Sequence, residues 1–279
     1  MPRAFIVAAV ASLAACSTAD NDITGSIPRE QPPAPASPEN VASLTEVIQR
    51  NPADPQAYNM RGTAFGQSGR TQEAIADFSK AISLDPRYAP AYANRALIYR
   101  QTGRRDLALA DYNKAIAADP TYAAAYLGRG IVNRDGGNLR AALADFNKAV
   151  EIRPDNAQAL YNRGLLYQSQ GQHQYAVADF QAAIAIAPRE AEPHVARALS
   201  LMAMNDNKAA VEHLDQAVGL EPGNIGAWAS RGLAYERLGD REKSAGSYAR
   251  ALQLDRDYQP AKAGFARVGG QFGRTYQAF

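Results

Sequence analysis

An arginine recurs every 34 residues along the chain, and this fixed step constrains the fold more than any other feature. The segment LYNRGLLY, residues 160–167, places Arg163 among apolar side chains, and segments of the same kind occur six times. The six arginines are Arg61, Arg95, Arg129, Arg163, Arg197 and Arg231. A constant period of this length is typical of proteins built from stacked structural repeats. We therefore expect that whatever Arg163 does is done in every repeat.

Two further residue columns keep the same step and mark where helices end. Proline recurs at Pro52, Pro86, Pro120, Pro154, Pro188 and Pro222. Glycine recurs at Gly69, Gly103, Gly137, Gly171 and Gly239, with Asn205 in the fifth repeat. Proline cannot continue a helix, and a glycine in the left-handed conformation ends one. Each repeat is therefore predicted to hold one helix before its glycine and a second helix after it.

Small and aromatic residues recur at positions suited to packing these helices together. The small residues are Gly62, Ala96, Gly130, Gly164, Ala198 and Gly232, and again Ala74, Ala108, Ala142, Ala176 and Ala210. The aromatic residues are Tyr58, Tyr92, Tyr126 and Trp228, and again Phe78, Tyr112, Phe146, Phe180 and Tyr248. Small residues let paired helices approach closely, and aromatic rings fill the space between repeats. A single repeat cannot cover its own apolar face, so its neighbours must cover it.

This pattern closely resembles the tetratricopeptide repeat. The resemblance implies an all-α fold, a right-handed α-solenoid of six helix pairs at 55–88, 89–122, 123–156, 157–190, 191–224 and 225–258. We expect an N-terminal capping helix at 38–51, because Val41, Leu44, Val47 and Ile48 share one helical face. A C-terminal capping helix is expected at 259–268, followed by a flexible tail at 269–279.

The N-terminus has the features of an export signal. Arg3 precedes an apolar run, residues 4–15, which is too short to span a bilayer. The chain's one cysteine, Cys16, follows Leu13-Ala14-Ala15, and these four residues resemble the lipobox of bacterial lipoproteins. The resemblance implies a signal peptide at 1–15, lipidation of Cys16, and a protein held at the periplasmic face of the outer membrane. The alternative is an ordinary cleaved signal. Residues 16–37, rich in proline, serine and alanine, are predicted to be a disordered tether.

A column of aspartates accompanies the arginines. Asp77, Asp111, Asp145 and Asp179 lie 16 residues after Arg61, Arg95, Arg129 and Arg163, and the column continues as His213 and Ser247. A repeated cation and a repeated anion on neighbouring helices predict a set of ion pairs, here called the arginine ladder. The sequence leaves open whether Arg163 pairs with Asp179 in its own repeat or with Asp145 in the preceding one. A structural role is favoured for these arginines.

The resemblance also places a binding surface on the concave face of the array. An apolar strip is expected there, with arginines at its rim. The strip consists of Leu97, Ile131, Tyr161, Leu165, Val195, Leu199 and Leu233, and the rim includes Arg100 and Arg134. Some members of the family clamp a peptide carboxylate with lysine at the fifth and asparagine at the ninth position of a repeat, and no repeat here has that pair. The strip could bind a partner, or some of its leucines could pack within the helix pairs.

The sequence offers no pattern for catalysis or for metal binding. The three histidines, His173, His194 and His213, lack metal-ligand spacing, and His194 and His213 fall in the aromatic and aspartate columns. No nucleophile elbow, phosphate loop or dinucleotide motif occurs. With 30 basic and 28 acidic residues the net charge is +2, without a basic stripe for nucleic acid. We therefore expect no enzyme, no cofactor, no metal and no nucleic-acid partner.

Taken together, lipobox, tether and repeat array are similar in layout to the new-lipoprotein-I family. That similarity implies a membrane-anchored periplasmic adaptor for protein or peptide partners, among them cell-envelope hydrolases or proteases. The alternative with the same layout is an assembly lipoprotein of a pilus or secretion system. The membrane would be contacted through the lipid alone, and a homodimer is left open.

Overall fold

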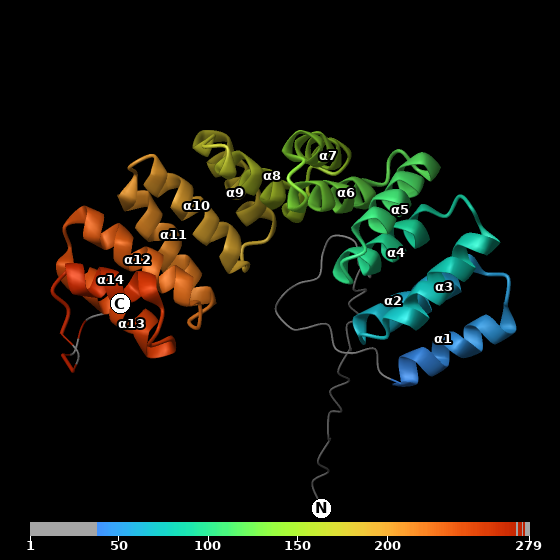
Figure 1. Cartoon of the computed structure of the whole chain (residues 1–279), viewed down its shortest axis with the longest axis horizontal. Helices are drawn as coiled ribbons and strands as arrows, with labels where there is room; N and C mark the ends of the chain where they lie inside the picture. Colours follow the sequence, from blue (N-terminus) through green and yellow to red (C-terminus); the bar gives the residue numbers. More distant parts are fainter. Residues whose placement is uncertain (1–37, 272, 275, 277–279) are drawn as a thin grey trace, which may run out of the picture.

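A curved array of helix pairs forms the part of the chain that a computed structural model describes, residues 38–271, 273, 274 and 276. That part contains helices and no strand (Figure 1). The helices are α1 (Pro38–Arg50), α2 (Pro55–Gln67), α3 (Thr71–Leu84), α4 (Ala89–Gln101), α5 (Arg105–Ala118), α6 (Ala123–Asp135), α7 (Leu139–Ile152), α8 (Ala157–Ser169), α9 (His173–Ile186), α10 (Ala191–Ala203), α11 (Asn207–Leu220), α12 (Ile225–Leu238), α13 (Arg241–Leu254) and α14 (Gln259–Arg267). None of them is both long and apolar enough to cross a membrane.

The predicted columns lie at the helix ends. The side chain of Asp54 accepts a hydrogen bond from the backbone N–H of Gln56 at the start of α2, with Pro55 as the first helical residue. The first helix of each pair ends just before a residue with positive φ, which is glycine in five repeats and Asn205, with φ 64°, in the fifth. Asparagine tolerates this conformation better than most residues, so the fifth turn keeps its shape.

Curvature follows from which helices touch. The first helices of successive repeats contact one another, from α2 with α4 through to α12 with α14, whereas their second helices do not contact each other among the described residues. The first helices are therefore closer together and line the inner side of the arch. Figure 1 shows this most plainly for α2, α4 and α6, which lie inside α3, α5 and α7.

The core runs along the array between the two rows of helices. The alanine column at Ala74, Ala108, Ala142, Ala176 and Ala210 has no exposed surface. The aromatic column beside it is also buried, at Phe78, Tyr112, Phe146, Phe180 and Tyr248, with Leu214 taking its place in the fifth repeat. Each ring packs at a boundary between repeats, so neighbouring repeats share one continuous core.

Each tyrosine in this aromatic column has a glycine 16 positions later in the sequence. A Cβ atom added to Gly128 would lie 2.3 Å from Tyr112, and one added to Gly264 would lie 2.1 Å from Tyr248. The corresponding residues after Phe78, Phe146 and Phe180 are Asn94, Asn162 and Ala196. The tyrosine ring therefore extends to the next repeat, where a glycine without a side chain leaves room for it.

The two ends of the array differ from its middle. Phe265 on α14 stands where a seventh arginine would lie, 34 residues after Arg231, and is buried. Tyr276, in the segment predicted to be a flexible tail, packs edge-on against Phe265 with ring centroids 5.8 Å apart. The predicted signal peptide and tether, residues 1–37, lie outside the described residues, and so do Phe272 and Phe279.

Candidate functional site

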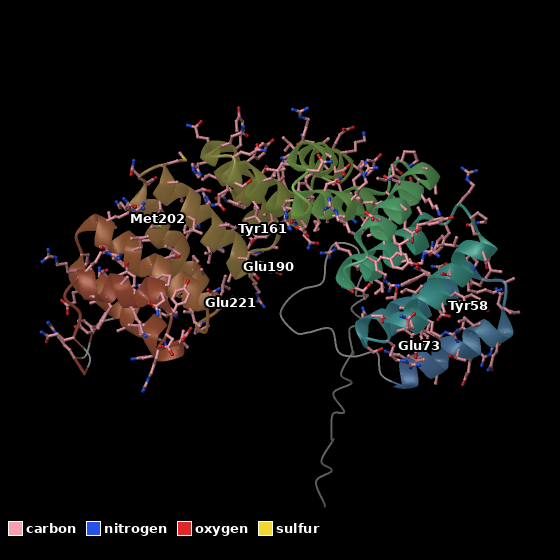
Figure 2. The ribbon with its side chains drawn as sticks, viewed as in Figure 1. Tyr58, Glu73, Tyr161, Glu190, Met202 and Glu221 are labelled. Atoms are coloured by element: carbon pink, nitrogen blue, oxygen red, sulfur yellow. The ribbon has the colours of Figure 1, made fainter. Side chains whose placement is uncertain are left out.

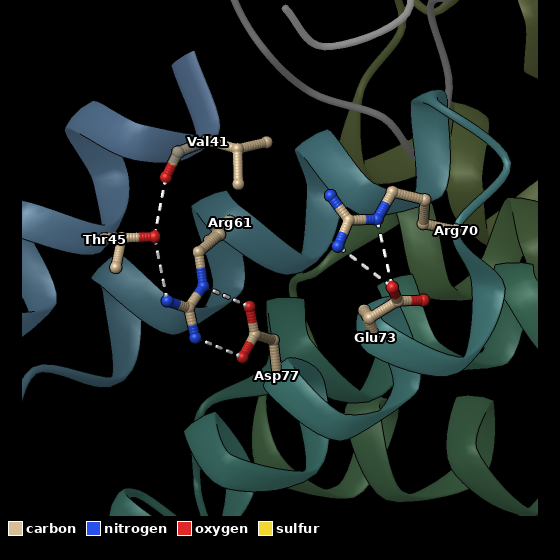
Figure 3. A network of polar contacts seen from close by, with 6 residues as sticks. All are labelled: Val41, Thr45, Arg61, Arg70, Glu73 and Asp77. Atoms are coloured by element: carbon tan, nitrogen blue, oxygen red, sulfur yellow. Dashed lines mark hydrogen bonds and ion pairs between the residues drawn. The ribbon is translucent and has the colours of Figure 1, made fainter. Parts of the chain in front are cut away.

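Each arginine of the ladder joins three helices. In the first repeat the Nε and Nη2 atoms of Arg61 on α2 donate to the carboxylate of Asp77 on α3, at 2.7 and 2.9 Å. Its Nη1 atom donates to the hydroxyl of Thr45 on α1, at 3.1 Å, and that hydroxyl donates to the backbone carbonyl of Val41 (Figure 3). Arg61 therefore ties its own helix pair together and also reaches the helix before it.

The same geometry recurs in the next three repeats. The alternative left open by the sequence is resolved, because Arg163 pairs with Asp179 of its own repeat, Nε and Nη2 lying 2.8 and 2.7 Å from the carboxylate. The other pairs are Arg95–Asp111 and Arg129–Asp145, each with a shortest distance of 2.7 Å. Across the repeat boundary the Nη1 atoms donate to neutral side chains, which are Ser79, Asn113 and Asn147.

The pairs are largely removed from water. Asp179 is 6% exposed, and the hydrogen bond that Arg163 donates to this carboxylate raises the pKa of the Arg163 guanidinium. Bidentate bonds between a guanidinium and a carboxylate combine charge with fixed geometry. Such a pair need not add net stability, but removing one partner strands the other charge. All three nitrogen atoms of the Arg163 guanidinium donate hydrogen bonds within the array, which favours a structural role.

The ladder changes in the fifth and sixth repeats. Arg231 on α12 has Ser247 at the aspartate position and instead pairs with Asp215 on α11 of the preceding repeat, with Nε 2.6 Å from the carboxylate. Arg197 on α10 has a carboxylate on neither side: its Nη1 atom contacts Gln181 on α9 and His213 on α11. Its Nε atom is buried without a hydrogen-bond partner. Burial accordingly lowers the pKa of Arg197, in contrast to Arg163.

The inner surface of the arch is where the apolar strip was expected, and the structure divides that strip in two. Leu97 and Ile131 are only 8% and 9% exposed, so the strip prediction is wrong for these two residues. Ile131 lies in the core with Leu127 on its own helix and Leu166 on α8. Leu199 on α10, by contrast, is 41% exposed.

The other strip residues on α8, α10 and α12 are partly buried. Tyr161 and Leu165 on α8 pack against the core with Phe180, and Tyr161 faces the inner side of the arch (Figure 2). Val195 on α10 and Leu233 on α12 likewise pack against the core while keeping some exposed surface. The accessible part of the strip therefore lies on α8, α10 and α12.

The two rim arginines are engaged in contacts within the array. Arg134 donates from Nη1 to Asn162 on α8, at 2.5 Å, and from Nε and Nη2 to Asp135. Arg100 lies beside the hydroxyl of Tyr112, whose pKa is raised to about 12 by burial and held back by this cation. Arg134 therefore links the first helices α6 and α8, whereas Arg100 links α4 to α5 within its own pair.

Polar contacts between first helices were missed by the sequence analysis. Gln168 on α8 donates from Nε2 to the hydroxyl of Ser200 on α10, at 2.8 Å, and Asn94 donates from Nδ2 to Asn59, at 3.0 Å. One signal was present, since Asn94 and Asn162 stand two full steps apart in the same column. These bonds tie neighbouring first helices together, with Asn94 and Ser200 buried.

Among the described residues, no three or more histidine, cysteine, aspartate or glutamate side chains gather as a set of metal ligands. His194 and His213 do meet, with their Nδ1 atoms 3.2 Å apart, but as a pair of packed rings.

Comparison with solved structures identifies the architecture. YrrB, described as a TPR protein with an unusual peptide-binding site, shares 25% identity over 67% of this chain and 96% of its own, with a TM-score of 0.59. The Pseudomonas aeruginosa pilF protein shares 20% identity over 78% of this chain and 99% of its own, with a TM-score of 0.70. The Cut9-Hcn1 structure matches 84% of this chain at 17% identity and a TM-score of 0.69, and this chain spans about half, 46%, of that one.

Family models give the same answer from the sequence. A search of curated proteins finds no match. A model described as TPR repeat matches residues 62–103 and 132–171, and two described as tetratricopeptide repeat match 89–122, 157–190 and 195–259. Proteins of this kind bind peptides or other proteins, so the repeats indicate a protein–protein interaction scaffold. The chain belongs to the tetratricopeptide-repeat family, and its helix pairs form an all-α solenoid of that family.

Proposed function

We propose that this protein is a lipid-anchored adaptor of the bacterial envelope, which binds partner proteins in the periplasm on the inner surface of α8, α10 and α12. The observation that carries the binding role is the exposure of Leu199, at 41%, in the middle of that surface. An exposed leucine surrounded by other apolar groups gains free energy when a partner covers it.

The chemistry of the surface favours an extended protein segment as the partner. Tyr161, Leu165, Val195 and Leu233 offer apolar area on the same three helices as Leu199, and the partly exposed Gln168 on α8 offers a polar group. The family's members bind peptides, and YrrB is described by its peptide-binding site. Cell-envelope hydrolases or proteases are the partner class that the layout favours, and an assembly role for a pilus or secretion system is the second candidate.

Replacing Leu199 with aspartate tests the binding surface. We expect Leu199→Asp to leave the fold intact, because the side chain is already in contact with water, and to reduce partner capture from envelope extracts at least tenfold. Leu107→Asp is the matched control, since Leu107 is 48% exposed but lies on α5, a second helix on the outer side. Circular dichroism confirms folding of both variants, and pull-down measures binding.

Equal capture of every partner by a folded Leu199→Asp protein would move the binding site away from this surface. A comparison with Leu97→Asp adds a check on the assignment of core and surface. Because Leu97 is 8% exposed, that variant should lose its helical signal at a lower temperature.

The lipid anchor has its own test at Cys16. We expect Cys16→Ser to abolish incorporation of labelled palmitate, because the thiol that would carry the lipid is gone, and to release the protein from membranes into the periplasmic fraction. Acyl chains contribute about 0.8 kcal/mol per buried CH₂, so their loss removes the anchor. Undiminished labelling of Cys16→Ser would show that the anchor assignment is wrong.

A further inference from the structure

The fifth arginine position carries an arrangement that no other repeat has. His213 stands where Asp77, Asp111, Asp145 and Asp179 stand in the first four repeats. Those four carboxylates each accept hydrogen bonds from the arginine of their repeat. His213 instead places its Nε2 atom 2.7 Å from Nη1 of Arg197.

The hydrogen bonds assign the protons on both histidines. Arginine can only donate, so Nε2 of His213 must accept from Arg197. The proton of His213 is therefore on Nδ1, which donates to Nδ1 of His194 on α10 at 3.2 Å. His194 then carries its own proton on Nε2, and it hydrogen-bonds the backbone of Pro188. The chain of bonds is complete only while both rings are neutral.

Protonation of either histidine is unfavourable in this cluster. Protonated His213 would present an N–H to the N–H of Arg197, and protonated His194 would present one to Nδ1–H of His213. Among the described residues, the bonds of these three side chains include none to a carboxylate: α9 contributes neutral Gln181, and the exposed Glu212 lies beside His213 on α11. Asp179 on α9 is held by Arg163, and Asp215 on α11 is held by Arg231. Two cations would therefore meet at hydrogen-bond distance.

We propose that the cluster of His194, Arg197 and His213 is an acid-responsive joint that loosens the packing of α10 on α11 within the fifth repeat when the histidines take up protons. The joint connects α9, α10 and α11, because Arg197 contacts both Gln181 and His213. Helix α10 also carries Leu199. The pH response of the joint does not depend on the proposed function, whereas an effect of acid on partner binding rests on the proposed function.

The direction of the pH dependence follows from the pKa values. Burial, with the charge of Arg197, lowers the pKa of His213 from 6.5 to about 4, and burial also lowers that of His194. At pH values between the two pKa values of His213, 6.5 unfolded and about 4 folded, the unfolded chain binds a proton at His213 and the folded chain does not. The free energy of unfolding therefore falls as the pH falls. At pH 5 the equilibrium constant for folding should be lower than at pH 8 by a factor of about 10 to 30.

Urea unfolding of the full chain between pH 5 and 8 tests this joint. The wild-type midpoint should fall steadily as the pH drops from about 7 to 5, and His213→Asp, which restores the carboxylate of the first four repeats, should remove most of that slope. His213→Asn is the second variant, since it cannot take up a proton and adds no charge. It should flatten the slope as well, even if either replacement costs stability overall.

His173→Gln is the matched control, because His173 begins α9 and is not part of the cluster. It should keep the wild-type slope. A wild-type midpoint that does not change between pH 5 and 8 would overturn the proposal, and so would an unchanged slope in both His213 variants. Loss of the slope in His173→Gln would place the titrating group elsewhere.

Discussion

Replacing Arg163 with alanine is expected to destabilise the fold by about 3–5 kcal/mol. The substitution removes the guanidinium that holds Asp179, which is 6% exposed, and leaves a carboxylate without its counter-charge in the interior. It also removes the bond to Asn147, which crosses to the preceding repeat. Urea unfolding followed by circular dichroism measures the change.

The control for this prediction is Arg153→Ala. Arg153 lies 3.8 Å from Asp155 with 55% of its side chain exposed, and surface pairs of that kind contribute about 0–1 kcal/mol. The double variant Arg163→Ala/Asp179→Ala should recover part of the loss, because no charge is stranded. Wild-type stability of Arg163→Ala together with loss of partner capture would assign Arg163 to binding instead.

Replacing Gly128 with alanine is expected to cost about 1–3 kcal/mol, although alanine is the better helix former. The added Cβ would lie 2.3 Å from the ring of Tyr112, which packs across the repeat boundary and is 1% exposed. Either the ring or the helix must move to relieve this contact. Thermal unfolding of the purified chain measures the effect.

Gly219→Ala is the matched control on α11. A Cβ there would meet nothing within 4 Å, so the variant should be more stable by about 0.5–1 kcal/mol. The double variant Tyr112→Phe/Gly128→Ala recreates the combination of Phe180 with Ala196, and it should be more stable than Gly128→Ala alone. Additive effects of the two substitutions would show that Tyr112 and Gly128 are not coupled.

The regular 34-residue step made the helices predictable from the sequence. Which residues are exposed on the inner surface was not predictable in this way. Helix ends followed from glycine, proline and asparagine, whose backbone preferences are local. Exposure on the inner surface is not local, because it depends on how closely successive first helices pack. Leu97 and Leu199 occupy the same position of their repeats, yet one is 8% and the other 41% exposed.

The arginine ladder was predicted in part for a similar reason. The aspartate column was visible because one residue type recurs, and only its pairing within repeats needed the structure. The contacts across repeat boundaries were missed, since Thr45, Ser79, Asn113 and Asn147 share a polar oxygen but no residue type. The contact of His194 with His213 could not be read from two residues 19 positions apart.

Whether an arginine pairs with a carboxylate in its own repeat or in the preceding one has a consequence for how such an array can evolve. In the first four repeats the charge pair lies inside one helix pair, so duplication or loss of a whole 34-residue unit there divides no ion pair. The bond between Arg231 and Asp215 crosses from the sixth repeat to the fifth. Loss of either unit alone would leave one of these charges without its partner. Each of the first four repeats therefore carries its own charge pair, whereas the sixth depends on the fifth for its carboxylate.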